Sequence, residues 1–220
     1  MPDIALIDPE LHLSCPPAVT AACGLDAFTQ LLEAYTSTNA NPITDVLAFS
    51  GLERIQQCLL RVSSSDATNL ELRARMAYGA LLSGITLANA GLGIVHGFAS
   101  SIGGFFDIPH GIVCGTLLAS ATRVNIEALN SEGGRGLIVL DRYAKAGNLW
   151  VPDKTLTIPE GCNLLVKKLY EWEDVLQIPK LGNYGVGISD IEKIIAKTSN
   201  KNNPVTLNKN QMRQILEERV

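Results

Sequence analysis

Aromatic residues are scarce in this chain of 220 residues, where Phe, Trp and Tyr together make up 5%. Ala, Leu and Ile dominate the hydrophobic residues instead, and this composition favours packed helices over a sheet. Hydrophobic residues make up 46% of the chain, which is therefore long and apolar enough to bury a sizeable core. A disordered protein is excluded on these grounds.

Several signals that would assign a functional class are also missing. The net charge is −4 without a cluster of Lys or Arg, so we expect neither a nucleic-acid partner nor a membrane partner. Asp3 and Asp8 interrupt the first apolar run, so we expect no signal peptide, and we find no apolar stretch of about 18 residues that would span a membrane. No GxGxxG motif follows a strand and no Walker motif occurs, so the residues themselves show no fold for holding a nucleotide.

Cysteine usage excludes a disulfide framework. The five cysteines form an odd set without a CxxC pair, and a chain of this length needs no covalent staple. We interpret them as reduced, mostly buried core residues of a cytoplasmic protein. They are Cys15, Cys23, Cys58, Cys114 and Cys162.

The hydrophobic pattern predicts one all-α domain over residues 1–220, entered through a short extended segment at 3–13. Asn41 and Pro42 are typical of an N-cap and a first helical position. Gly24 is expected to separate two helices, and residues 131–136 to form a flexible connector. The expected helices cover residues 17–23, 25–37, 42–62, 69–89, 95–103, 110–129, 137–149, 162–176, 189–199 and 208–219.

The chemistry-bearing residues gather in two segments. Two of only three histidines, His96 and His110, bracket a glycine-rich stretch at 91–111, while Asp26 and Gln30 lie four residues apart and share one helix face. Two imidazoles, a carboxylate and an amide suffice for a four-ligand site that suits Fe²⁺ or Zn²⁺. The glycines of the stretch allow the close backbone approach that a ligand or a second domain would need.

Simpler interpretations stay open from the residues alone. Asp26 can cap a helix after Gly24, Gln30 can be a surface amide, and a histidine in an apolar segment can be a hydrogen-bonded core residue. The remaining candidates are expected to be structural: His12 as a structural or surface histidine, Trp150 and Trp172 in packing, and Glu171, Glu173 and Asp174 on a solvated helix face.

Two motifs and several shorter segments carry a family resemblance. The stretches GLDAFTQLLEAYTS at 24–37 and GLGIVHGFASSIGGFFDIPHG at 91–111 resemble the paired signature of the iron-containing (group III) alcohol dehydrogenases. DPEL at 8–11, NPITD at 41–45 and NPVTL at 203–207 are also similar to that family. The resemblance implies the family's C-terminal helical domain, of the dehydroquinate synthase-like kind.

The resemblance implies a metal held by Asp26, Gln30, His96 and His110, with Fe²⁺ expected before Zn²⁺. Gln30 stands where the family usually carries a third histidine, and Ser100 where many members have another histidine. The implied substrate is a small alcohol or aldehyde, beside Phe98, Ser100 and Phe106.

The resemblance further implies NAD or NADP bound by an N-terminal dinucleotide-binding domain, which we expect to be absent from this chain. The chain is then the metal-binding catalytic half of an alcohol dehydrogenase or aldehyde reductase, inactive alone and homo-oligomeric. The competing hypothesis is a non-catalytic helical domain that folds and self-associates without metal.

Overall fold

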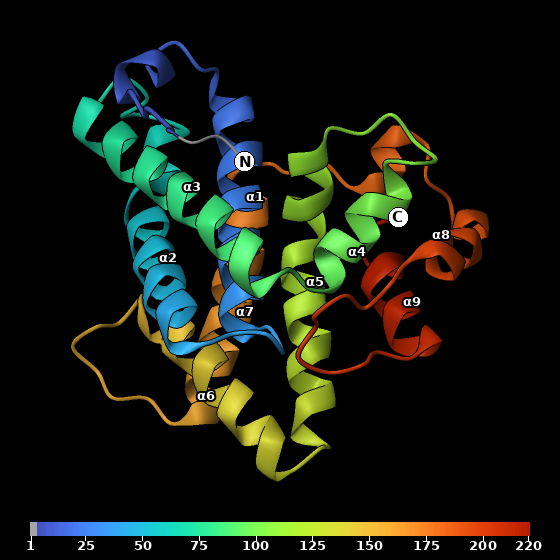
Figure 1. Ribbon diagram of the computed structural model, residues 1–220. Helices are drawn as coiled ribbons and strands as arrows, with labels where there is room; N and C mark the ends of the chain where they lie inside the picture. The colour runs from blue at the N-terminus through green and yellow to red at the C-terminus, as the bar shows by residue number, and fades with distance from the viewer. Residues whose placement is uncertain (1–3) are drawn as a thin grey trace.

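One long helix, α5 (His110–Asn130), stands at the centre of the molecule and packs against α1, α4, α6, α7 and α9 (Figure 1). In the computed structural model, which describes residues 4–220, nine α-helices and three short 3-10 helices occur and no strand is present. The prediction of an all-α fold is therefore confirmed.

The other helices form groups around α5. Helices α1, α2 and α3 pack on one another on one side of α5. Helix α6 pairs with α7, and α4, α8 and α9 cover the opposite side of α5 (Figure 1). Their bounds are η1 Pro9–His12, α1 Pro17–Thr36, α2 Pro42–Val62, α3 Leu70–Ala90, α4 Ile94–Ile102, α6 Gly134–Asn148, α7 Ile158–Val175, η2 Leu181–Tyr184, η3 Ile188–Asp190, α8 Ile191–Lys197 and α9 Lys209–Glu217.

Local capping explains why α2 begins where the sequence predicts. Asn41 Oδ1 accepts hydrogen bonds from the N–H groups of Ile43 and Thr44 at 3.0 and 3.2 Å, and Thr44 Oγ1 accepts from Asn41 N–H at 2.9 Å. This capping box satisfies backbone donors that a helix start leaves free, and Pro42 has no N–H to satisfy. The predicted range 42–62 is confirmed.

Gly24 does not separate two helices, because α1 runs through it without a break. A Cβ at this position would lie 2.3 Å from Leu59 Cδ1, so the glycine lets α2 approach α1 closely. The prediction of two helices is wrong here because the glycine serves packing between helices, which the local pattern does not reveal.

Smaller corrections concern the segment ends. Part of the expected extended entry is the 3-10 helix η1, and residue 3 of that entry lies outside the described residues. The connector after α5 is shorter than expected because α6 already begins at Gly134. Helix α7 begins at Ile158, four residues before the predicted start, since Thr157 and Glu160 form a capping box there.

One described helix, α5, is long and apolar enough to cross a membrane, contrary to the expectation from the sequence. In the fold, 89% of its apolar window is buried. Its apolar residues therefore face neighbouring helices, as in the central helix of a packed bundle.

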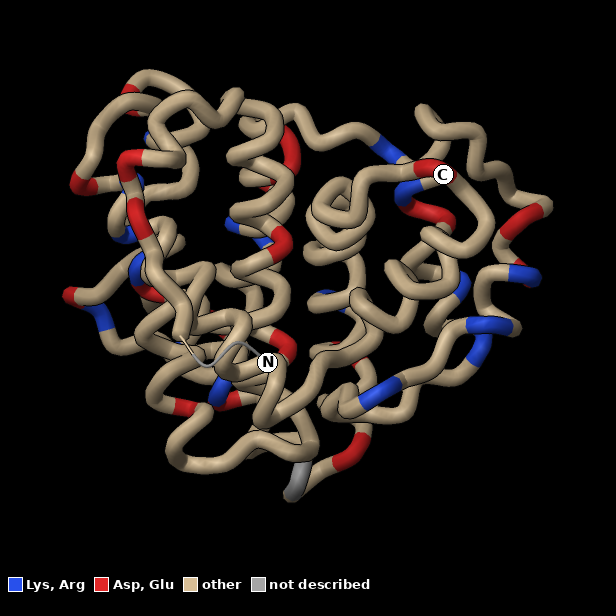
Figure 2. Tube along the Cα trace, turned by 45° about the horizontal axis from the view of Figure 1, so that its top comes forward, with Lys and Arg blue, Asp and Glu red and all other residues tan. Residues whose placement is uncertain are grey.

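Acidic and basic residues are interspersed along the trace of the whole molecule (Figure 2).

Two predictions about α7 have different outcomes. Trp172 is buried and stacks edge-on against Phe28 and Trp150, at ring distances of 4.9 and 5.3 Å, so its packing role is confirmed. Glu173, expected on a solvated face, is only 4% exposed and lies 3.2 Å from the Arg219 guanidinium. Burial raises the pKa of the Glu173 carboxyl to about 7, although Arg219 acts to lower it.

This buried carboxyl predicts a stability that falls as pH rises. The folded-state pKa of Glu173 is about 7 against 4.5 for an ordinary glutamate carboxyl, so the folded state binds the proton more tightly than the unfolded state. The protonated Glu173 carboxyl contributes fully to the free energy of unfolding below pH 4.5. This contribution, at most about 3 kcal/mol, is lost as the pH rises through 7. Glu173→Gln mimics the protonated carboxyl and should remove this decline, as measured by urea unfolding at pH 5 and pH 8. The control variant Glu171→Gln, at a partly exposed position of the same helix, should keep the decline in stability between pH 5 and pH 8. If Glu173→Gln showed the same decline as the wild type, the assignment to Glu173 would be contradicted.

Candidate metal centre

Four side chains from three helices converge on one point. They are Asp26 of α1, His96 of α4, and His110 and Cys114 of α5, and one donor atom from each lies within 4.8 Å of the others. Asp26 Oδ1 is 3.2 Å from His96 Nε2 and 3.6 Å from His110 Nε2. His96 is buried, whereas the His110 side chain is 54% exposed. The cluster is therefore enclosed on one side and open on the other.

A buried carboxylate fixes the orientation of His96. Glu33 Oε2 accepts a hydrogen bond from His96 Nδ1 at 2.7 Å, and Oε1 accepts one from Val95 N–H at 2.7 Å. Because Nδ1 is engaged, Nε2 is the ring nitrogen that faces Asp26. Glu33 thus sets both the ring position and the tautomer, as acidic partners of metal-bound histidines do.

The backbone at the start of α4 is held by a polar network. The chain bends by 96° between α3 and α4, at Gly91, which has φ +72°. Asn203 Oδ1 then accepts from Ile94 N–H at 3.2 Å, and its amide exchanges hydrogen bonds with Asn125 at 2.7 and 3.2 Å. These contacts anchor the first turn of α4 and therefore His96 two residues later.

The glycines of this stretch make room for the chain itself. We call residues 199–203 the C-terminal strap. A Cβ on Gly97 would lie 2.2 Å from the Ser199 carbonyl oxygen, and those on Gly91 and Gly93 would lie 2.3 and 2.8 Å from the side chains of Asn202 and Asn203. The expectation of a ligand or second domain is corrected for Gly91, Gly93 and Gly97, because the strap occupies the space beside them.

Within the cluster, Asp26 and His96 form a charged pair. Burial alone would lower the pKa of His96, but its hydrogen bonds and charge interactions with Asp26 and Glu33 raise it to about 9. Burial would raise the pKa of Asp26, but hydrogen bonds from His96 and Cys114 and the charges of both histidines lower it. Burial first, and then Asp26, raise the pKa of the Cys114 thiol. A cation binding here would displace protons from these groups.

Gln30 lies beside the cluster with its amide already engaged. Its Oε1 accepts a hydrogen bond from Ser83 Oγ at 2.8 Å, and its Nε2 lies 3.5 Å from Asp26 Oδ2. The interpretation of Asp26 as a helix cap does not apply, because Asp26 lies in the interior of the unbroken α1.

The three residues expected around a substrate lie in different surroundings. Phe98 is completely buried in the core, and Ser100 on the same face of α4 as His96 is exposed. Ser100 Oγ donates to the His96 carbonyl at 2.8 Å and accepts from Lys201 Nζ at 3.2 Å. Phe106 is partly buried, with Lys193 Nζ 4.8 Å from its ring centre. A substrate at these residues stays a prediction.

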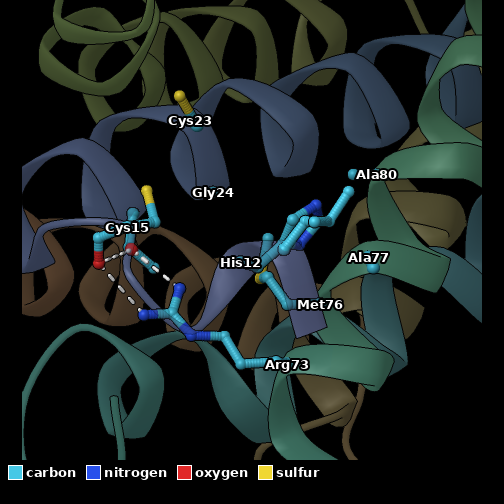
Figure 3. A pocket seen from close by; sticks show the side chains of 10 residues that line it. His12, Cys15, Cys23, Gly24, Arg73, Met76, Ala77 and Ala80 are labelled. Carbon is cyan, nitrogen blue, oxygen red and sulfur yellow. Dashed lines mark hydrogen bonds between the residues drawn. The ribbon is translucent and has the colours of Figure 1, made fainter. Parts of the chain in front are cut away.

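A separate cavity of about 310 Å³ lies between η1, α1 and α3, and none of the four cluster residues lines it (Figure 3). His12, Cys15, Met76 and the buried Arg73 are among its lining residues. The Arg73 guanidinium donates to Thr20 Oγ1 at 2.9 Å and to the Cys15 carbonyl at 3.2 Å (Figure 3). Arg73 therefore fixes the segment that leads into α1.

The sequence reasoning missed Glu33 and Cys114 as members of this site. Glu33 follows Asp26 by seven residues and Cys114 follows His110 by four, so both lie on the helix faces that carry those residues. All five cysteines are free, as expected, although Cys23 is exposed rather than buried. Helical spacing from Asp26 and from His110 is the sequence signal that indicates these two residues.

The fold and the cluster together define a helical domain with a candidate transition-metal centre of carboxylate, imidazole and thiol donors. Residues 20–220 match the family model described as Fe-containing alcohol dehydrogenase family, C-terminal. The chain belongs to this family.

Named relatives support the same assignment. The chain is 33% identical to an NADPH-dependent butanol dehydrogenase of Clostridium saccharobutylicum, covering 98% of this chain and 54% of that protein. It is 35% identical to alcohol dehydrogenase 4 of Saccharomyces cerevisiae, covering 78% and 47%. The crystal structure of a 1,3-propanediol oxidoreductase superposes with a TM-score of 0.86 at 30% identity, covering 97% and 55%. The chain spans about half the length of these relatives.

The strap predicts that a residue far from the cluster in sequence governs the stability of α4. Asn203→Ala would leave the Ile94 N–H and the Asn125 Oδ1 atom without these partners in the core, while Asn125 Nδ2 keeps the Tyr143 hydroxyl, and the loss should cost about 2–4 kcal/mol. Asn210→Ala, at an exposed position of α9, should change stability by less than about 0.5 kcal/mol. Chemical unfolding followed by circular dichroism measures both; equal effects would mean that the network does not hold α4.

Proposed function

We propose that this chain is the metal-binding catalytic half of an NAD(P)-dependent alcohol dehydrogenase or aldehyde reductase. The observation that carries the proposal is the convergence of Asp26, His96 and His110 on one half-open point in a domain of the Fe-containing alcohol dehydrogenase family. Two imidazoles and a carboxylate are a donor set that divalent transition metals accept. The residues present therefore fit Fe²⁺ or Zn²⁺.

When bound, the metal would act as a Lewis acid that polarises the alcohol or carbonyl oxygen. Asp26, His96 and His110 would hold it, each through the atom that already faces the cluster. Glu33 accepts a hydrogen bond from His96 Nδ1 and so keeps His96 Nε2 turned toward the metal. The exposed side of His110 is the direction from which a small alcohol or aldehyde can approach.

The nicotinamide cofactor is proposed for the part of the enzyme that this chain does not include. The relatives are about twice as long as the matched region, and one of them is named as NADPH-dependent. Because nothing in the described residues forms a dinucleotide-binding turn after a strand, hydride transfer requires that other half. Substrate contacts at Ser100 and Phe106, homo-oligomer formation and a cytoplasmic location are parts of the same proposal.

Metal binding predicts a thermal shift that depends on both histidines. After removal of metal with a chelator, Zn²⁺ or anaerobic Fe²⁺ at about 100 times its Kd should stabilise the chain by about 3 kcal/mol. For a chain of this length, the melting temperature should rise by about 5–10 °C. The double variant His96→Ala and His110→Ala should show no shift, whereas His12→Ala, on η1, should keep it. A shift retained by the double variant would place the metal elsewhere, and no shift in the wild type would favour a non-catalytic helical domain.

Because the proposal places the metal in this chain and the nicotinamide cofactor in the other half of the enzyme, this chain alone should be inactive. The purified 220 residues, loaded with metal, should not reduce small aldehydes above background with either NADH or NADPH. Absorbance of the reduced nicotinamide measures this rate directly. Robust turnover by the chain alone would contradict the assignment of cofactor binding to the other half, and would leave the metal-binding result unaffected.

A further inference from the structure

We infer that the fourth donor of this metal centre is the Cys114 thiolate and not the Gln30 amide. The inference rests on the proposed metal-binding function and concerns which atoms hold the ion. Cys114 lies one helical turn after His110 on α5, so the two side chains point to the same side of that helix. Its Sγ is 3.5 Å from His110 Nε2 and 3.7 Å from His96 Nε2.

Four of the six separations between the donor atoms match those around a tetrahedral ion. Bonds of about 2.0–2.1 Å to nitrogen or oxygen and about 2.3 Å to sulfur place the donors about 3.4 Å apart, or about 3.6 Å where one is sulfur. The two nitrogen–oxygen separations here are 3.2 and 3.6 Å. The two nitrogen–sulfur separations are 3.5 and 3.7 Å. The four donor atoms are therefore close enough together to bind one ion.

Gln30 is committed to other partners. Its carbonyl oxygen accepts from Ser83 of α3, and its amide nitrogen, which faces Asp26, is a donor that does not bind cations. Gln30 could offer oxygen to the cluster only with the amide turned over, whereas Cys114 Sγ already faces both histidines.

Ligand chemistry also favours the thiolate over an amide. A coordinated thiol gives its proton to solvent, since metal binding deprotonates it. A donor set of sulfur, two nitrogens and oxygen in a tetrahedron favours Zn²⁺, because thiolate is a soft ligand.

Co²⁺ titration tests the inference directly. Thiolate coordination to Co²⁺ gives a charge-transfer band in the near ultraviolet, separate from the visible bands of the ion. The metal-free wild-type chain should develop this band at one equivalent of Co²⁺, and Gln30→Ala should keep it. Cys114→Ser should lose the band and bind Co²⁺ about 100-fold or more weakly, since even outer partners of a ligand contribute about 10–100-fold.

Two other thiol variants serve as controls. Cys23→Ser removes the exposed thiol nearest in sequence to Asp26, and Cys162→Ser removes a buried thiol on α7; both should keep the band. Circular dichroism of each metal-free variant verifies folding, and the wild-type spectrum decides the matter even if Cys114→Ser does not fold.

The outcomes separate the two proposals. Visible Co²⁺ bands without the charge-transfer band in the wild type, or a coordination spectrum changed by Gln30→Ala and not by Cys114→Ser, would overturn the assignment of Cys114 and leave the metal site intact. Absence of any Co²⁺ binding by the wild type would instead sink the proposed function together with this inference.

Discussion

The site depends on one buried contact, the hydrogen bond between the Glu33 carboxylate and the imidazole of His96. The two residues are 63 positions apart and come from helices that meet only through tertiary packing. A carboxylate in this environment is costly unless it is fully paired, and Glu33 obtains a second partner from the Val95 N–H. The same carboxylate thus aligns a side chain and a helix end, so the first turn of α4 cannot shift without breaking both bonds.

The C-terminal part of the chain completes this arrangement from the other side. Asn203 binds the start of α4 and also Asn125 on α5, the helix that carries the exposed histidine of the cluster. The two histidine-bearing helices are therefore linked through a residue from near the end of the chain. Because these polar groups are buried, they confer a specific geometry that apolar packing alone would leave looser.

Local sequence signals predicted the helices well and the side-chain environment less well. The start of α2 was predictable since Asn41, Pro42 and Thr44 interact with one another. Asp26, His96 and His110 were recognised by residue type and resemblance, and the structure brings them together. The prediction of a helix break at Gly24 was wrong because the residue that requires a glycine there, Leu59, is distant in sequence. The surroundings of Gln30 and the burial of Glu173 depend on Ser83 and Arg219, which no pattern along one helix could indicate.

The close passage of the strap over Gly97 has a consequence for how this domain tolerates change. A carbonyl oxygen that would sit 2.2 Å from any added Cβ leaves no room for insertions or rerouting between α8 and α9. The loop between α6 and α7, at 149–157, is exposed over residues 152–155. Members of this family can therefore accept insertions in that loop, while the C-terminal strap must retain its length and path over α4.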